Sequence, residues 1–302
     1  MKSNRALHAV AAVTAAALLL FVPGALSAQD GTLDTTFAVR AGTRLSVSNQ
    51  SGEVVVRGWD RNQVRVVAAY DRARVEIDEG AGRVTIRTVH RRGHDDVDYT
   101  ITVPRGTAVE VNGISNDVDV TGVCGVVNVN TVSGDVNVQC AEGDVIIQSV
   151  SGDVAVADAR GGVEAGSTSG DVDIRNARGP VSGHSVSGDV SLSQIEGTEA
   201  YAQTVSGEIL YSGRVQDGGR YRFEAHSGDV TVHVAGTLNA TIGVETFSGE
   251  FESDFPIEIQ PGTTLGRKWE FRQGSGSARL RLSSFSGTIS LRRGLRSPSR
   301  EE

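Results

Sequence analysis

The chain has few cysteine, methionine, lysine and aromatic residues, and each shortage argues against a class of protein. Its 302 residues include two cysteines, one methionine, 2 Trp, 5 Tyr and 8 Phe, a profile that fits a helical bundle poorly. No Cys-x-x-Cys pair is present, so a zinc site is not supported. Lysine occurs only as Lys2 and Lys268, and the formal net charge is -8. An acidic chain argues against nucleic acid as a partner.

Glycine, by contrast, is abundant. There are 37 glycines beside 38% hydrophobic residues, so the chain has enough apolar material to bury a core. Glycine inside a strand or helix costs about 0.5–1 kcal/mol, so a folded chain this rich in glycine uses it at recurring turns. The composition predicts short strands and many turns.

The N-terminus has the pattern of a secretory signal peptide. Lys2 and Arg5 precede an apolar run that ends at Pro23, and small residues around Ala28 offer a cleavage site. The run is short for a membrane anchor, and no later segment is long and apolar enough to span a bilayer. We therefore predict that residues 1–28 are removed and that the mature chain is exported without a transmembrane segment.

A repeat of 18 residues dominates the centre of the chain. Ser-Gly followed by an acid recurs with this spacing from Ser133 to Ser187 and continues with spacings of 19 to 21 residues to Ser248, and Ser-Gly returns at Ser286, followed there by threonine. A second glycine series, beginning at Gly125, falls midway between these turns. Between turns, apolar residues alternate with polar ones, as the two-residue period of a strand requires. The sequence predicts an all-β, single-stranded β-solenoid with coils of about 18–21 residues, each made of two strands and two turns.

The Ser-Gly turns form one column of structural positions. Because asparagine replaces glycine once in it, and both residues tolerate positive φ, the column predicts a left-handed turn conformation. Its members are Gly52, Asn116, Gly134, Gly152, Gly170, Gly188, Gly207, Gly228, Gly249 and Gly287.

The repeat also predicts the domain organisation. Residues 115–250 are expected to form the regular solenoid, and the less regular strand-like segments of residues 29–114 an N-terminal β cap continuous with it. Residues 251–295 are expected to form a C-terminal β cap, and residues 296–302 a disordered tail.

Tandem Ser-Gly-Asp-Val units, preceded by a Thr-Ile-Thr-Val-Pro segment that ends at Pro104, resemble the putative bacterial adhesin family of β-strand-repeat proteins. The likeness covers roughly residues 36–292. It implies an exported, repetitive β protein, and some relatives look associated with envelope stress responses. The family offers no catalytic motif, so the resemblance assigns no residue a chemical role.

The acid after each Ser-Gly forms a second column, the candidate site for a cation. Coils stack at about 4.8 Å, so neighbouring carboxylates could hold calcium between them. The alternative is that each acid caps local backbone donors, and the substitution of glutamate at two positions favours this view. We predict no cofactor, with calcium as the one ion to test. The column comprises Asp117, Asp135, Asp153, Asp171, Asp189, Glu208, Asp229 and Glu250.

Hydroxyl residues also recur in pairs around the Ser-Gly turn. Rows of hydroxyls can face ice or sugars, although small outward residues at strand ends explain the pattern equally simply. The pairs are Thr131/Ser133, Ser149/Ser151, Ser167/Ser169, Ser185/Ser187 and Thr204/Ser206.

Two smaller groups are candidates for other chemistry. Cys124 and Cys140 lie in successive coils of a chain predicted to reach an oxidising compartment, so a disulfide is favoured over two buried thiols. His90, His94, Asp95 and Asp96 share one loop, but Arg91 and Arg92 oppose a metal there.

These observations favour a non-enzymatic exported protein of the bacterial periplasm or cell surface, either an adhesin or a cell-envelope interaction module. Its partner would be an unknown protein or an envelope polymer. A regulatory or sensory component of envelope stress signalling is the alternative. A carbohydrate-active β-helix enzyme fits less well, because residues 115–200 contain no aromatic side chain on which a sugar could stack.

Overall fold

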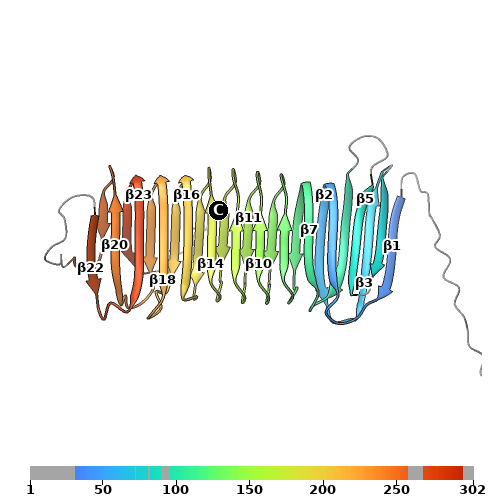
Figure 1. The fold of residues 1–302 in the computed structure, drawn as a ribbon, viewed down its shortest axis with the longest axis horizontal. Coiled ribbons are helices and arrows are strands. Elements are labelled where there is room, and N and C mark those ends of the chain that lie inside the picture. The colour runs from blue at the N-terminus through green and yellow to red at the C-terminus, as the bar shows by residue number, and fades with distance from the viewer. Residues whose placement is uncertain (1–30, 72, 81, 90–95, 258–267, 295–302) are drawn as a thin grey trace, which may run out of the picture.

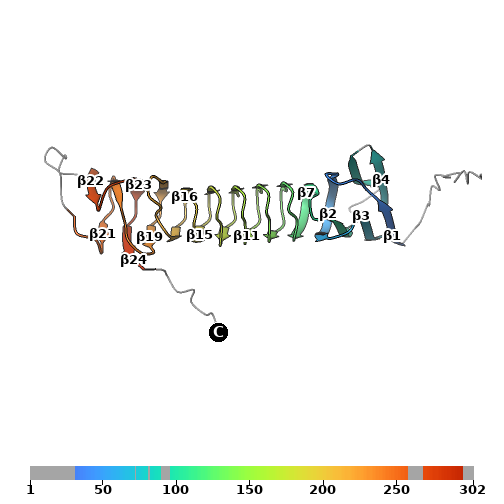
Figure 2. The ribbon, with the colours of Figure 1, turned by 90° about the horizontal axis from the view of Figure 1, so that it is seen from below.

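The protein is a long stack of β-coils in the computed structural model, which describes residues 31–71, 73–80, 82–89, 96–257 and 268–294. Within these ranges the regular structure is entirely β, in 24 strands. Figures 1 and 2 show the coils following one another along a single axis. The predicted signal peptide, the loop with His90 and His94, and the tail from residue 296 lie outside the described residues.

The centre of the stack consists of six coils of two strands each. Every strand pairs in parallel with the strand one coil away, so the chain alternates between two sheets that face each other. The predicted single-stranded solenoid is confirmed. Its strands are β8 (Val127–Asn130), β9 (Val136–Gln139), β10 (Val145–Gln148), β11 (Val154–Ala157), β12 (Val163–Gly166), β13 (Val172–Arg175), β14 (Val181–Ser185), β15 (Val190–Ile195), β16 (Glu199–Ser206), β17 (Ile209–Gly213), β18 (Arg220–Ser227) and β19 (Val230–Val234). We call the sheet that contains β8, β10, β12, β14, β16 and β18 sheet 1, and the sheet that contains β9, β11, β13, β15, β17 and β19 sheet 2.

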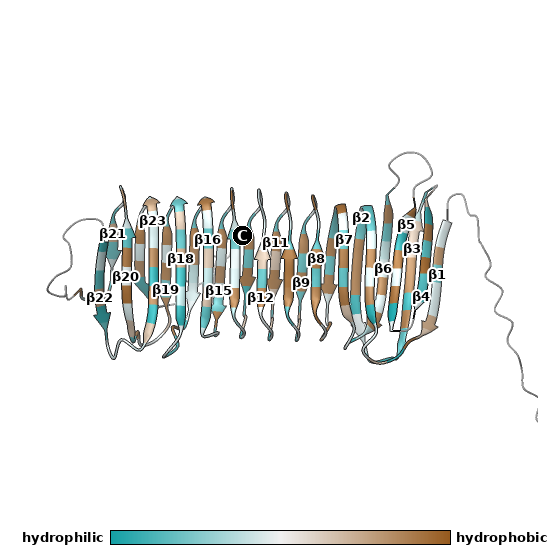
Figure 3. Ribbon diagram, viewed as in Figure 1, coloured by the Kyte–Doolittle hydropathy of each residue, from teal (hydrophilic) through white to brown (hydrophobic). Residues whose placement is uncertain are grey.

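The core is a thin apolar layer between the two sheets. Alternate residues point inward, as at Val136 and Val138 in β9, which are at most 1% exposed. Figure 3 shows the resulting hydrophobic and hydrophilic bands along the strands. In the longer coils after residue 200, aromatic rings widen the core, and Tyr211 lies 4.9 Å from Phe223 between ring centroids. Burying one inward valine contributes at most about 1.5–3 kcal/mol, so stability accumulates coil by coil.

At the N-terminal end, two long strands run through both sheets. β2 (Arg44–Trp59) and β7 (Ala108–Thr121) pair in parallel with each other, and the next coil outward consists of β5 (Arg83–Val89) and β6 (Val97–Pro104). The edges beyond that coil are antiparallel: β4 (Arg74–Gly80) pairs with β5 in sheet 1, and β3 (Gln63–Tyr70) and then β1 (Gly31–Ala38) follow β6 in sheet 2. Reversed strands thus cover both open edges of the parallel stack.

The C-terminal end is out of chain order. The coil of β23 (Ala278–Ser286) and β24 (Ile289–Arg293) lies between the β18–β19 coil and the coil of β20 (Ala240–Thr246) and β21 (Phe251–Ser253). β22 (Lys268–Gln273) closes sheet 1 as an antiparallel edge on β20. The long interval from Ser248 to Ser286 therefore contains β21 and the edge strand β22, after which β23 and β24 form a coil one position earlier in the stack.

Glycine occupies the Ser-Gly turn column because successive coils touch there. A Cβ built on Gly170 would lie 2.1 Å from the carbonyl oxygen of Gly152, and one built on Gly188 would lie 2.3 Å from that of Gly170. The prediction that all positions of this column adopt the left-handed conformation is wrong. Positive φ values, between 105° and 147°, occur at Gly52, Gly134, Gly152, Gly228 and Gly287. Positive φ does not occur at Asn116, Gly170, Gly188, Gly207 and Gly249.

Asn116 shows why one side chain is tolerated in this column. Its amide nitrogen donates to the carbonyl oxygen of Gly52 at 3.0 Å, and its amide oxygen accepts the Ile114 N–H at 3.2 Å. The side chain is fully buried and bridges backbone groups of two coils. The asparagine is thus selected for hydrogen bonding, not for positive φ.

We expect Gly170→Ala to lower the melting temperature markedly, because its Cβ must displace the backbone of the coil below. The destabilisation should be about 2 kcal/mol or more, the range for strained or overpacked substitutions. Gly243→Ala in β20 is the matched control, since its Cβ would meet nothing within 4 Å. Thermal denaturation of both variants measures the difference, and equal melting temperatures would contradict the close-approach explanation.

Candidate functional site

The acid column forms a ladder of hydrogen bonds between coils. One carboxylate oxygen of Asp135 accepts the backbone N–H of Asp153 at 2.9 Å, and Asp153 in turn accepts that of Asp171 at 2.9 Å. The same bond joins each aspartate from Asp117 to Asp189 to the acid one coil further on. The column therefore caps backbone donors, although in the next coil and not locally as the sequence suggested.

Glutamate appears in this column only where no such ladder bond forms. Among the described residues, neither Glu208 nor Glu250 accepts the backbone N–H of another coil. Asp229 resumes the pattern by accepting the N–H of Thr288 at 2.6 Å. Aspartate has the shorter side chain and holds its oxygen beside the turn, which explains the choice between the two acids.

The first hydroxyl of each predicted pair lies inside the turn. Ser185 and Thr204 are at most 4% exposed. Each donates to a glycine carbonyl one coil earlier, at 2.9 Å to Gly170 and Gly188 respectively. The interpretation of these residues as outward-facing is therefore wrong, and no row of paired hydroxyls faces solvent at these positions.

The two cysteines do not form the disulfide that the sequence favoured. Both are free thiols, Cys140 exposed and Cys124 partly buried, so the alternative of two buried thiols is also incorrect. With the 18-residue spacing, the residue stacked on Cys124 is Glu142. Cys140 lies two positions before Glu142 and is therefore not stacked on Cys124. Burial, and then a hydrogen bond to Glu142, raises the pKa of the Cys124 thiol.

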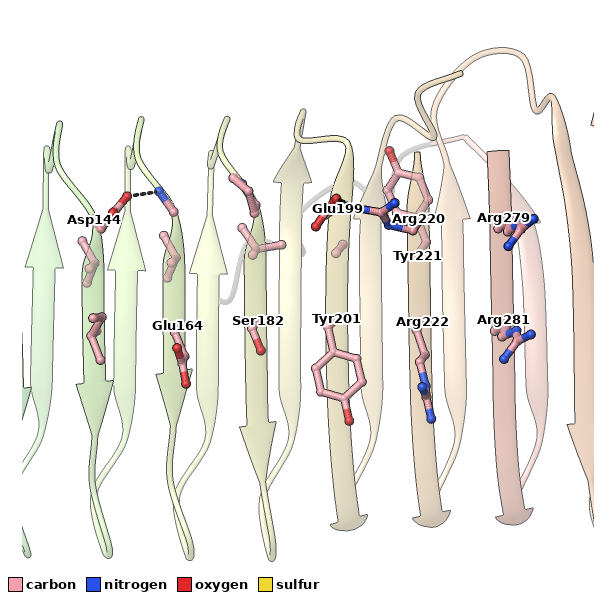
Figure 4. A pocket seen from close by; sticks show the side chains of 17 residues that line it. Asp144, Glu164, Ser182, Glu199, Tyr201, Arg220, Tyr221, Arg222, Arg279 and Arg281 are labelled. Atoms are coloured by element: carbon pink, nitrogen blue, oxygen red, sulfur yellow. Dashed lines mark hydrogen bonds and ion pairs between the residues drawn. The ribbon is translucent and has the colours of Figure 1, made fainter. Parts of the chain in front are cut away.

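The outward surface of sheet 1 carries the most varied chemistry in the described part of the chain. Around its C-terminal half, an open depression of about 780 Å³ crosses β10, β12, β14, β16, β18 and β23. Figure 4 shows its side chains in two parallel rows that run from strand to strand. One row contains Glu164, Ser182, Tyr201, Arg222 and Arg281, and the other contains Asp144, Glu199, Arg220 and Arg279. We call this surface the sheet 1 depression.

Charge changes sign along the depression. Acids lie toward its N-terminal end, whereas β18 and β23 each contribute two arginines in register, Arg220 beside Arg279 and Arg222 beside Arg281. Arg222 is paired with Glu224 at 2.7 Å, and Arg220 is paired with Glu199. Neither Arg279 nor Arg281 forms an ion pair with any residue that the structure describes.

Tyr201 lies at the middle of the depression. Figure 4 shows its ring nearly face-on, so one face of the ring is turned to solvent between Ser182 and Arg222. Its hydroxyl donates to Gln203 Oε1 at 2.6 Å. Burial, followed by the charge of Glu224, raises its pKa, while Arg222 opposes the change. The phenol therefore stays protonated at neutral pH.

A row of exposed apolar side chains borders the same sheet at its Ser-Gly end. Among its members, Val150, Val186 and Val205 are 42% to 47% exposed. Toward the C-terminus the row becomes aromatic, where His226 stacks on Phe285 at 4.9 Å and Phe285 on Phe247 at 4.6 Å. These rings line a second open depression of about 800 Å³. The sequence analysis missed this row, although its signal was the apolar residue that precedes the Ser-Gly turn in most repeats, valine at four of them and phenylalanine at two.

The candidate metal ligands do not come together in the described ranges. No group of three or more His, Cys, Asp and Glu side chains converges there on a point where a metal ion could bind. Of the loop proposed from His90 to Asp96, only Asp96 is described. The same ranges contain no helix that is long and apolar enough to cross a bilayer.

We expect Asp153→Ala to destabilise the protein by about 1 kcal/mol, because the Asp171 N–H loses its charged acceptor. Asp153→Asn should have a smaller effect, since the amide oxygen can still accept. Glu208→Ala is the control, because this acid accepts no ladder bond. Denaturant unfolding compares the three variants, and equal losses for Asp153→Ala and Glu208→Ala would contradict a specific ladder.

For calcium, we expect EDTA to leave the melting temperature unchanged, because one oxygen of each ladder aspartate is already held by a backbone donor. Differential scanning calorimetry with EDTA, and then with excess calcium, measures this. A fall with EDTA that calcium reverses would show that the acid column binds the ion. Magnesium at the same ionic strength controls for general screening of the acidic solenoid.

Comparison with known proteins yields a family and three solved chains, among them the following two. A putative cell adhesion protein from Clostridium sporogenes is 8% identical with a TM-score of 0.28, over 88% of this chain and 100% of that chain. A putative adhesin from Parabacteroides distasonis is 12% identical with a TM-score of 0.38, over 86% of this chain and 97% of that chain. No curated protein matches. The family model matches residues 43–292, and the chain belongs to the Toastrack DUF4097 family.

Proposed function

We propose that the protein is a non-enzymatic binding module of the bacterial cell envelope, an adhesin or an envelope interaction module, that holds its ligand on the outward surface of sheet 1. Export rests on the signal peptide predicted for residues 1–28. The mature chain would then act in the periplasm or on the cell surface, where envelope polymers and surface ligands are accessible.

The sheet 1 depression is the observation that carries this proposal. It is open and long enough to receive an extended ligand, and it offers an aromatic ring, hydroxyls and charges of both signs. A site with a few placed polar groups around an apolar or aromatic surface is typical of ligand binding. Most of its residues lie on paired strands instead of loops, so their spacing is set by the coil register and little conformational freedom is lost when a ligand binds.

The acids in the depression support binding over hydrolysis. Asp144 accepts the Gly162 N–H at 2.8 Å, and Glu199 is paired with Arg220. A glycosidase instead needs two carboxyl groups free to act as acid and as nucleophile or base on either side of the scissile bond. An open surface also leaves the ligand in water, which favours reversible attachment over chemistry that requires a closed site.

The aromatic end of the apolar row extends the same surface. Phe285 and Phe247 lie on β23 and directly after β20, on the side of sheet 1 that carries Arg279 and Arg281. A ligand that crosses several strands could therefore contact both depressions. Exposed apolar rows bordered by polar residues are a common mark of interaction surfaces.

We expect Tyr201→Ala to weaken attachment of the purified mature chain to isolated cell-envelope material by ten-fold or more, because the ring is the central contact surface. Co-sedimentation over a concentration series measures the apparent affinity. Ser191→Ala is the matched control, since Ser191 points outward from β15 on sheet 2. Equal affinity of both variants and the unmodified chain would contradict the proposed surface, provided that their melting temperatures agree.

A further inference from the structure

We propose that the sheet 1 depression binds an acidic oligosaccharide, with Arg279 and Arg281 holding a sugar carboxylate and Tyr201 stacking on a neighbouring sugar ring. This inference rests on the proposed function and names the ligand class of the same site. It also assigns a role to Arg279 and Arg281, which form no ion pair with a described residue.

The four arginines of β18 and β23 form a compact cationic group. Strands lie about 4.8 Å apart and alternate residues about 6.7 Å apart, so their Cα atoms occupy the corners of a small rectangle. Like charges in register on neighbouring strands are destabilising. Arg220 and Arg222 are paired with Glu199 and Glu224, whereas Arg279 and Arg281 add two positive charges that form no ion pair with a described residue. An anion bound on β23 would neutralise this positive charge.

The neighbouring strand leaves room for that anion. Opposite Arg281 on β20 stands Gly243, where even a Cβ would meet nothing within 4 Å, and opposite Arg279 stands Thr241. Neither residue is an acid that could form an ion pair with the two guanidinium groups. The nearest acid in the row of Arg281 is Glu270, one strand further out on β22. Guanidinium groups bind a carboxylate through two parallel hydrogen bonds, which suits two exposed arginines on one strand.

The rest of the depression selects against a dense polyanion. From the arginines toward the centre of the stack it is lined by Glu199, Glu164 and Asp144, and residues 115–212 carry 14 acids and three arginines. Such a surface repels a chain with a charge on every unit. A ligand with one acidic group over β23 and uncharged hydroxyl-bearing rings over Tyr201 and Ser182 fits both ends. This is the chemistry of an oligosaccharide that contains an acidic sugar.

Isothermal titration of the mature chain with a trisaccharide of one terminal glucuronic acid and two neutral glucose units, and with its neutral methyl ester, tests the proposal. We expect the acid to bind at least ten-fold more tightly. Arg279→Gln combined with Arg281→Gln should abolish that preference and leave binding of the ester unchanged, whereas Tyr201→Ala should weaken both. The control is Arg44→Gln with Arg83→Gln, an adjacent exposed arginine pair at the far end of sheet 1. This control should bind like the unmodified chain.

Several outcomes would overturn the inference. These are absence of binding of the acid at millimolar concentration, equal affinity for acid and ester, or no effect of the Arg279/Arg281 substitutions. If inorganic phosphate binds as tightly as the acidic trisaccharide, the site is a simple anion site. If polyphosphate binds more tightly than the acidic trisaccharide, the argument from the acidic neighbours is refuted. If these results occur while Tyr201→Ala still weakens attachment to envelope material, the proposed function stands and only the ligand class fails.

Discussion

The close approach of successive backbones at the Ser-Gly turn is the constraint on which the rest of this structure depends. At Gly152 and Gly170 the carbonyl of one coil occupies the space that a side chain of the next would need. The inward valines, the buried hydroxyls that donate to glycine carbonyls and the aspartate ladder all require that coils stack in register. Because each coil contacts only its neighbours, the register set at one turn fixes the position of every outward side chain along both sheets.

The same dependence on neighbours explains the order of the last coils. Among the described strands, β20 pairs with β23 and β22, so its one parallel partner there comes later in the chain. The β20–β21 coil therefore cannot complete its pairing until residues up to Arg293 are present. Inserting β23–β24 places a coil with parallel partners on both sides next to β18, and leaves the antiparallel β22 to cover the edge of sheet 1. Local strand reversal thus closes both sheets at the N-terminal end and sheet 1 at the C-terminal end.

The sequence predicts the coil well and the site poorly, for physical reasons. The alternation around Val136 and Val138 reflects the two-residue period of a strand, and the 18-residue interval reflects the length of one coil. Both periods are visible in a single sequence. The cause of each turn glycine was misjudged, because close approach and positive φ select the same residue. The arginine group could not be found from spacing: Arg222 and Arg281 are 59 residues apart and meet only because a later coil inserts beside β18. Tyr201 joins their row through a 21-residue step that departs from the regular repeat.

The two acidic features of the stack have different physical consequences. In the turn column, the aspartates are bound to backbone donors, and their charge strengthens the contact between coils. On the outward surface of sheet 1, Glu199 is paired with Arg220, Glu164 lies further along the row toward the centre of the stack, and both shape the field that a ligand meets. Within the sheet 1 depression, the acidic part repels a ligand whose charge extends along it, whereas the arginines of β18 and β23 attract a single anionic group at one end. The repeat thus supplies the rigid framework, and the irregular coils after residue 200 supply the chemistry that distinguishes one ligand from another.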